Sequence, residues 1–289
     1  MASHVSPVEL PAASRIRSAT SRRGSRNVKL SSTQERLVGW TLRYGTIVVV
    51  LVAWQLASGT LMPEYLISSP VEVFTSFWDL LVSGTLLRNT GVTLLEILVG
   101  YPIGAVIGIS TGFLLGSNRV LAKAYSPIIT ALFGIPIVAI APLVVVWLGI
   151  GFASKVGIVA LLVFFLTFFN TYSGLKNMDR QYVDLARLMG ASRWEVVTKV
   201  VLPFVSPSIF AGLTIAVPQS VIAATVAEFI ASSEGLGFMI RRAAGVFETP
   251  TLIVGALMLM VIVLIANALI ARVERRVLRW RPQQTKEKA

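Results

Sequence analysis

The chain of 289 residues contains no cysteine and only one histidine, His4. Without cysteine it forms neither a disulfide framework nor a thiolate metal site, and a single histidine leaves almost no imidazole chemistry. The sequence also lacks the Gly-x-x-x-x-Gly-Lys-Ser/Thr motif that holds nucleotide phosphates. Nothing in it supplies a nucleophile, a metal site or an acid–base pair, so we expect no enzymatic activity and no cofactor bound by this chain.

Charge is scarce as well, and it is unevenly distributed. Charged residues make up 14% of the chain and hydrophobic residues 55%, with a mean hydropathy of +0.75, as is typical of a protein with several membrane spans. The net charge is +12, and nearly all basic residues fall on one side of the predicted spans. The exceptions are Arg88, Lys155, Arg241 and Arg242. This bias follows the positive-inside rule, predicts both termini in the cytoplasm, and explains the net charge without a nucleic-acid partner.

Long apolar runs predict six membrane-spanning helices, because about 20 apolar residues cross a bilayer. Their approximate ranges are 44–61, 90–115, 125–148, 156–172, 206–230 and 251–271. After the first span, residues 70–82 carry apolar side chains at helical spacing, which predicts an amphipathic helix on the outer membrane surface. Its apolar positions are Val71, Phe74, Phe77, Trp78 and Leu81, with Glu72 and Asp79 off that face.

Three regions follow from this pattern. Residues 1–40 form a basic, serine-rich tail that we expect to be disordered. Residues 41–274 form an all-α membrane domain, and residues 275–289 form a second basic tail. Both tails are predicted to lie in the cytoplasm, next to the membrane surface and its lipid.

Glycine and proline mark two of the spans. In the second span, glycine recurs every four residues, so that one helix face carries almost no side chains. These positions are Gly100, Gly104, Gly108, Gly112 and Gly116. We favour packing of this face within the subunit over a surface that slides or pairs during function. The third span contains Pro127, Pro136 and Pro142, whose freed backbone carbonyls must be satisfied by neighbouring helices or a cavity.

A polar stretch at residues 180–203 interrupts the apolar runs and predicts a hairpin of two short helices on the cytoplasmic side. Gly190 suits the left-handed residue that closes the first helix. Ser192 and Glu195 form a capping box that opens the second helix, and Pro203 is expected to end it. Apolar side chains on the hairpin would allow a partner protein to bind it. They are Tyr182, Leu185, Leu188, Met189, Trp194 and Val197.

The spacing in this stretch resembles the loop shared by permease subunits of ATP-binding-cassette (ABC) importers. The matching pattern is an acid and two small residues, then glycine, then an aliphatic residue and Leu-Pro. The residues in register are Asp184, Ala186, Gly190, Val200, Leu202 and Pro203. Two departures are mild: Asp184 stands where Glu is usual, and Leu185 where Ala is usual.

Much of residues 90–272 resembles the branch of this family that handles nitrate, sulfonates, taurine and similar small solutes. The matching segments are Pro142-Leu143, Trp147 to Gly149, Ser154-Lys155, Asn170-Thr171, Ala227-Glu228 and Gly235-Leu236-Gly237. The run that begins at Ala227 is also similar to members proposed for pyrimidine or flavin-type vitamins. Residues 1–40 lie outside the resemblance.

The resemblance implies a six-span subunit with a type I ABC importer-like permease fold, paired as a homodimer in the bacterial cytoplasmic membrane. It also implies two cytosolic ATP-binding subunits, which hold ATP and Mg, and an extracytoplasmic solute-binding protein. The hairpin would then dock onto an ATP-binding subunit and transmit its closure to the spans, the alternative being a merely structural loop. The residues expected in this coupling are Asp184, Ala186, Arg187, Gly190, Ala191, Ser192, Leu202 and Pro203.

Two polar residues in the fifth span are candidates for the translocation pathway. Ionisable groups inside membranes are costly and often functional, so Glu228 could line an outer gate or meet the solute, or it could pair with Arg241 or Arg242. Gln219 lies deeper and is a candidate to line the pathway, the alternative being an interhelical hydrogen bond. A second class of function, an ion-coupled secondary transporter or a channel without an ATPase, would lack an obvious proton relay or pair of broken helices.

Overall fold

The computed structural model describes residues 32–280, so the tail predictions for residues 1–31 and 281–289 lie outside the described residues. The chain divides into two compact units, residues 1–50 and 51–289, and the boundary falls inside helix α1 (Ser32–Ala57). In the first unit, α1 carries exposed apolar side chains and belongs to a candidate membrane span, Val38–Ala57. The helix ends at Ala57 and not at Leu61 as the sequence predicts, because a turn with Gly59 at φ +76° follows.

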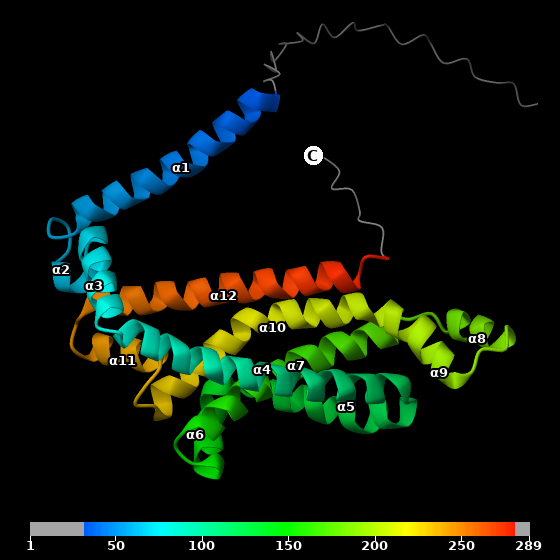
Figure 1. Cartoon of the computed structure of the whole chain (residues 1–289). Coiled ribbons are helices and arrows are strands. Elements are labelled where there is room, and N and C mark those ends of the chain that lie inside the picture. Colours follow the sequence, from blue (N-terminus) through cyan, green and yellow to red (C-terminus); the bar gives the residue numbers. More distant parts are fainter. Residues whose placement is uncertain (1–31, 281–289) are drawn as a thin grey trace, which may run out of the picture. The chain divides into compact units, whose positions relative to one another are not determined.

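Helix α3 (Pro70–Val82) covers one end of the second unit, next to the short helix α2 (Glu64–Ile67) (Figure 1). It begins at a capping box formed by Ser69 and Glu72. The expected single apolar face is wrong in detail. Val73, Phe77 and Leu80 pack against the core, whereas Val71, Phe74 and Trp78 are exposed. The helix is therefore apolar on two sides.

Helices α4 (Thr85–Ser117) and α7 (Phe152–Lys176) form the centre of the bundle, and they cross along the glycine stripe. A Cβ atom at Gly100 would lie 2.8 Å from the Cβ of Val159, and one at Gly112 would lie 2.8 Å from the carbonyl oxygen of Phe168. The helices approach this closely only because those positions lack side chains. The stripe therefore packs within the subunit, as predicted.

The third predicted span is not one straight helix. It consists of α5 (Arg119–Phe133) and α6 (Ile137–Leu148), which are bent by 99° at Gly134, Ile135 and Pro136. Proline at this point lacks an N–H donor and disfavours helical geometry in the residue before it. Prolines alone do not break the other helices, since Pro102 lies inside α4. The described residues thus hold five helices long and apolar enough to span a membrane, or up to six if the bent pair is one span.

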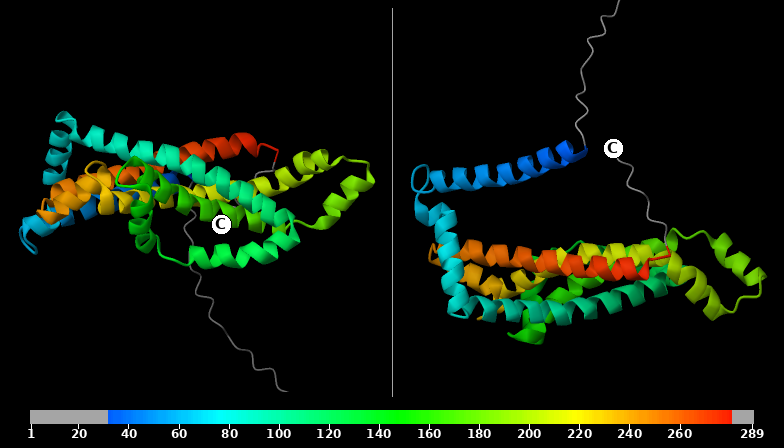
Figure 2. Two further views of the ribbon diagram at one scale, coloured as in Figure 1. Left: turned by 90° about the horizontal axis from the view of Figure 1, so that it is seen from below. Right: turned by 45° about the horizontal axis from the view of Figure 1, so that its top comes forward.

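The remaining helices complete the bundle. The hairpin consists of α8 (Arg180–Leu188) and α9 (Arg193–Glu195), which continues through a π-helical segment, η1 (Val196–Val201), into α10 (Leu202–Ala231). Then follow α11 (Leu236–Gly245) and α12 (Thr249–Val277). Within the second unit, α3 and α11 lie at one end of the bundle and the hairpin lies at the other, which Figure 2 shows from two further sides.

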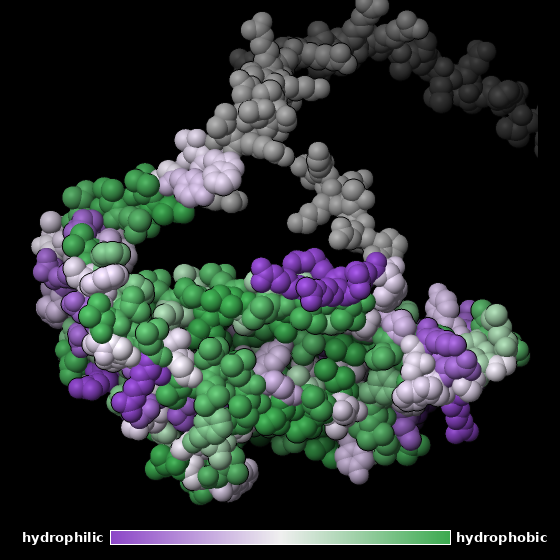
Figure 3. Space-filling view, viewed as in Figure 1, coloured by the Kyte–Doolittle hydropathy of each residue, from purple (hydrophilic) through white to green (hydrophobic). Residues whose placement is uncertain are grey.

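The surface of the second unit follows the same division. Apolar residues cover the visible sides of the central helices, whereas hydrophilic residues gather at both ends, over the hairpin and around α2, α3 and α11, and along the C-terminal part of α12 (Figure 3). Residues 32–280 form helices and no β-strand. An isolated β-bridge links Ser58 and Met62. The all-α membrane fold predicted from the sequence is confirmed.

Candidate functional site

The turn of the hairpin is built as the sequence predicts. Gly190 has φ +87°, a conformation that glycine adopts without a Cβ penalty. Its N–H donates to the carbonyl of Arg187 at 2.9 Å, and the N–H of Ala191 donates to the carbonyl of Ala186 at 3.0 Å. These two bonds form a Schellman motif, which satisfies carbonyls that the end of α8 would otherwise leave free.

The second helix opens with the predicted capping box. The N–H of Glu195 donates to Ser192 Oγ at 3.3 Å, and the N–H of Ser192 donates to Glu195 Oε2 at 3.0 Å. Lys199 Nζ donates to Glu195 Oε1 at 2.9 Å. The hydrogen bond from Lys199 and those from Ser192 lower the pKa of Glu195 to about 2, so this exposed carboxylate is ionised at neutral pH. The turn and the cap together fix the angle between α8 and α9.

Pro203 does not end the second helix, so that expectation is wrong, and α10 begins at Leu202 and not at residue 206. Leu202 keeps helical angles of φ −63° and ψ −45°, and its N–H donates to the carbonyl of Val197 five residues earlier. The wide π turn of η1 places this bond just before the proline, whose missing N–H is then accommodated within a continuous helix. Ser206 Oγ donates to the carbonyl of Pro203 at 2.8 Å.

The hairpin has two apolar faces, of which one is packed against the protein and the other is exposed. On the inner face, Val183, Ala186 and Ala191 pack against a cluster formed by residues of α7, η1 and α10. On the outer face, the apolar side chains at the tip have no partner within residues 32–280: Leu188 is 86% exposed, Met189 81% and Trp194 74%. The structure thus places Asp184, Arg187, Gly190 and Ser192 around an exposed apolar tip, while Leu202 and Pro203 lie beyond η1 at the start of α10.

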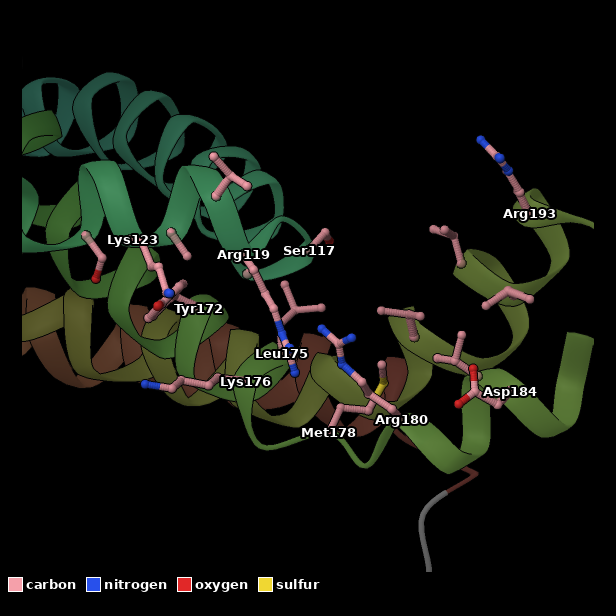
Figure 4. A pocket seen from close by; sticks show the side chains of 18 of the residues that line it. Ser117, Arg119, Lys123, Tyr172, Leu175, Lys176, Met178, Arg180, Asp184 and Arg193 are labelled. Atoms are coloured by element: carbon pink, nitrogen blue, oxygen red, sulfur yellow. The ribbon is translucent and has the colours of Figure 1, made fainter.

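A groove of about 1840 Å³ lies between the hairpin, α5 and the end of α7 (Figure 4). The side chains of Arg119 and Arg180 project into the space between α5 and α8. Six basic residues line this groove, together with one acid, Asp184. The basic residues are Arg119, Lys123, Lys176, Arg180, Arg187 and Arg193. We call this surface the basic groove.

At the opposite end of the bundle, Glu228 is fully buried and belongs to a hydrogen-bonded network. Thr93 Oγ1 donates to Glu228 Oε1 at 2.6 Å, and the N–H of Gly237 donates to Glu228 Oε2 at 2.5 Å. A Cβ at Gly235 or at Gly237 would collide with this carboxyl group. The two glycines therefore let the loop before α11 close over Glu228, and the alternative of a pair with Arg241 or Arg242 is not formed.

The same network contains a buried ion pair. Glu96 of α4 is 0% exposed and pairs with Lys155 of α7, which is 6% exposed and also donates to Ser232 Oγ at 3.0 Å. The N–H of Gly235 donates to Asn89 Oδ1 at 2.8 Å. We call Asn89, Thr93, Glu96, Lys155 and Glu228 the buried polar cluster. It ties α4, α7, α10 and the loop before α11 together.

Sequence reasoning placed Lys155 in an outer loop and missed its pairing with Glu96. A signal was present, since Glu96 lies near the outer end of the second predicted span and Lys155 at the outer end of the fourth. Unpaired buried charges are costly, so one acid and one base at the same depth in neighbouring spans favour a pair. Gln219 is partly exposed on α10 and makes no hydrogen bond within the described residues, so the alternative role of an interhelical hydrogen bond is not realised there.

Comparison with known proteins identifies the family. The family model described as "Binding-protein-dependent transport system inner membrane component" matches residues 100–279. The chain is 34% identical to the formylaminopyrimidine transport permease protein ThiX of Halalkalibacterium halodurans, over 82% of this chain and 94% of that protein. It is 35% identical to the riboflavin transport system permease protein RibX of Chloroflexus aurantiacus, over 81% and 88%. It is 32% identical to the putative aliphatic sulfonates transport permease protein SsuC of Escherichia coli, over 86% and 93%.

Solved structures agree on the fold. An inward-facing structure of the MetNI methionine ABC transporter matches with a TM-score of 0.61 and 21% identity, over 68% of this chain and 97% of that one. A bacterial alginate ABC transporter matches with a TM-score of 0.51 and 15% identity, over 86% and 94%. These matches, with the helices above, show the type I ABC importer permease fold. The family match and the permease relatives overturn the alternative of a secondary transporter or channel. This multi-span chain belongs to the family of binding-protein-dependent transport system inner membrane components, and it is a transport subunit of an ATP-driven importer and not itself an enzyme.

Proposed function

We propose that the hairpin couples this permease to two separate ATP-binding subunits, which hold ATP and Mg and hydrolyse the nucleotide. The observation that supports this is the exposed apolar tip at Leu188, Met189 and Trp194, held at a fixed angle by the turn at Gly190. A tip of this kind fits a groove on a partner. Closure of the ATP-binding pair would then move the spans between inward-open and outward-open states. A second copy of the permease and an extracytoplasmic solute-binding protein complete the proposed assembly.

Substitution of Gly190 tests the coupling. A Cβ at this position meets no atom of the chain within 4 Å, so a larger residue extends toward a partner, and it also strains the turn because Gly190 has φ +87°. We expect Gly190→Trp to lower solute uptake at least tenfold in reconstituted vesicles while membrane insertion is preserved. Gly190→Asn is the matched control, because asparagine tolerates the left-handed conformation, and it should retain more uptake. Unaltered uptake in the tryptophan variant would contradict the proposal.

We also propose that both termini lie in the cytoplasm, with the hairpin on the same side. Within the second unit, the hairpin, the start of α5 and the C-terminal part of α12 lie at the same end of the bundle (Figure 1), and each carries basic residues, in keeping with the positive-inside rule. The amphipathic α3 and the buried polar cluster would then lie near the outer surface of the membrane. Labelling of single cysteines introduced into this cysteine-free chain would test the orientation.

For the pathway, we propose that Gln219 lines it and that Glu228 acts at the outer gate by holding the loop before α11 closed. Glu228→Gln keeps the size of the side chain but replaces a carboxylate that accepts from Thr93 and Gly237 by an amide with one acceptor oxygen. We expect reduced transport with normal membrane insertion. Normal transport together with normal folding of this variant would contradict the proposed role of Glu228 at the gate.

The solute is proposed from the relatives. Among those reported above, the identities to the formylaminopyrimidine and riboflavin permeases are 34% and 35%, against 32% to the sulfonate permease. We therefore propose a small heterocyclic vitamin or vitamin precursor, with sulfonates, nitrate and taurine as the alternative class. Solute-stimulated ATPase activity of the reconstituted complex, measured with a member of each class, decides between them.

A further inference from the structure

The basic groove concentrates charge that the protein itself does not neutralise. Of the ion pairs formed within residues 32–280, none involves Arg119, Lys123, Lys176, Arg180, Arg187 or Arg193. The single carboxylate in the lining, Asp184, cannot balance six cations. By contrast Lys199, a short distance along the same hairpin, is paired with Glu195. A set of like charges around one hollow is unfavourable unless an anion enters it.

The groove is also apolar between its charges. Val120, Leu175, Val183 and Val196 contribute to its walls, and the apolar and basic residues alternate along α5 and the hairpin. Val120 is 76% exposed, and α5 has no buried residue at all. The hollow thus offers cations for an acidic group and hydrocarbon for an apolar one. Its volume of about 1840 Å³ is larger than the few hundred to about 1,000 Å³ of a small-molecule site.

We propose that the basic groove binds the headgroup and part of the acyl chains of an anionic phospholipid from the cytoplasmic leaflet. This proposal depends on the orientation proposed above, which puts the groove at the cytoplasmic surface. Basic pockets between membrane helices on that side suit anionic headgroups, and an acyl chain can follow the apolar wall of α5 toward the bilayer. The lipid would bridge α5 and α8, two elements joined in the chain only through α6 and α7.

A lipid fits these observations better than an acidic segment of a protein partner. An acidic peptide needs the cations but not the apolar walls, whereas a phospholipid uses both. The apolar tip of the hairpin, which is the surface proposed for the ATP-binding subunit, is formed by Leu188, Met189 and Trp194, and none of these three lines the groove. The lipid site therefore leaves the apolar tip free, although Asp184, Arg187 and Ala191 of the expected coupling residues also line the groove.

Native mass spectrometry of the full chain, purified with its ATP-binding subunits, tests the proposal. The complex is incubated with phosphatidylglycerol or with phosphatidylcholine, and the retained lipids are counted. We expect the wild type to retain phosphatidylglycerol and not phosphatidylcholine. Arg119→Gln/Arg180→Gln should lower retained phosphatidylglycerol by roughly tenfold or more, since each cation near an anionic lipid contributes to binding. The control Arg275→Gln/Arg276→Gln removes the same charge from α12, outside the groove, and should retain the lipid.

Equal retention of phosphatidylglycerol by the groove variant and the control would overturn the proposal. So would a groove variant that keeps the lipid but loses its ATP-binding subunits, because the groove would then hold an acidic protein segment. If the arginine pair fails to fold, Lys123→Gln/Lys176→Gln removes the same charge from the groove by another route. Lipid is counted on the permease itself, so absence of the ATP-binding subunits from the wild-type spectrum would contradict the proposed function and leave the lipid result readable.

Discussion

The two ends of the bundle differ in whether their charged side chains are buried and paired or exposed and unpaired. At the α11 end, Glu96, Lys155 and Glu228 are buried, and their hydrogen bonds join four segments of the chain. At the hairpin end, about 40 Å away along α10, the ionic groups are exposed and most of the basic ones are unpaired. Buried charges need their own partners within the protein, whereas exposed charges are free to meet another molecule. The comparison suggests that one end holds the subunit together and the other end serves its partners.

Replacing one lysine at each end should give the largest difference. Lys155→Met leaves the buried carboxylate of Glu96 without its cation, which typically costs about 3–5 kcal/mol. Lys199→Met removes an exposed partner of Glu195 and should cost about 0–1 kcal/mol. Thermal unfolding of the purified complex measures both. Equal losses of stability would break the comparison, because they would mean that the Glu96–Lys155 pair is not sealed from solvent.

A second substitution at the buried end tests whether the loss of stability in Lys155→Met comes from the unpaired charge of Glu96. Glu96→Gln in the Lys155→Met background removes the uncompensated charge, so it should recover about 0.5–3 kcal/mol of the lost stability. The same thermal measurement on the two single variants and the double variant completes the cycle. Additive losses would show that Glu96 and Lys155 do not act as a pair.

The two capping boxes provide the smallest contrast. Ser69 at the start of α3 is buried, whereas Ser192 at the start of α9 is exposed. Loss of an N-cap costs about 0.5–2 kcal/mol. Because Ser69 lies out of solvent and water cannot replace its bond, we expect Ser69→Ala near the top of this range and Ser192→Ala near the bottom. Hydrogen exchange at the first turn of each helix separates the two effects, and a larger loss at Ser192 would reverse the comparison.

The features that local sequence could predict are those with local causes. Apolar runs gave the spans, with α4, α7 and α12 close to their expected places, whereas α1 begins and ends earlier than the predicted range 44–61. The turn at Gly190 and the cap at Ser192 depend on neighbouring residues only, so both were predictable. The family spacing also pointed to the hairpin, whose coupling role stays a prediction.

The features that escaped prediction depend on how helices meet or on how a helix absorbs a defect. Pro136 breaks a span and Pro203 does not, although both interrupt the hydrogen-bond pattern. The difference is the local backbone: the N–H of Ile135 donates only three residues back, to Leu132, and Pro136 itself has non-helical angles of φ −58° and ψ 132°, whereas η1 widens ahead of Pro203 and Leu202 stays helical. Predicting the pairing of Glu96 with Lys155 required knowledge that α4 and α7 are neighbours. The glycine stripe indicated that α4 packs closely against another helix, but it did not indicate which one.

The wide turn of η1 carries one residue more than an α-helical turn needs. An α-helix needs only about 3.6 residues for a turn, and η1 fits its extra residue into one widened turn. Deleting a single valine from Val196–Val201 would therefore allow an unbroken α-helix and leave the tip of the hairpin facing nearly the same way. The extra residue thus accommodates Pro203 within the helix without turning the hairpin.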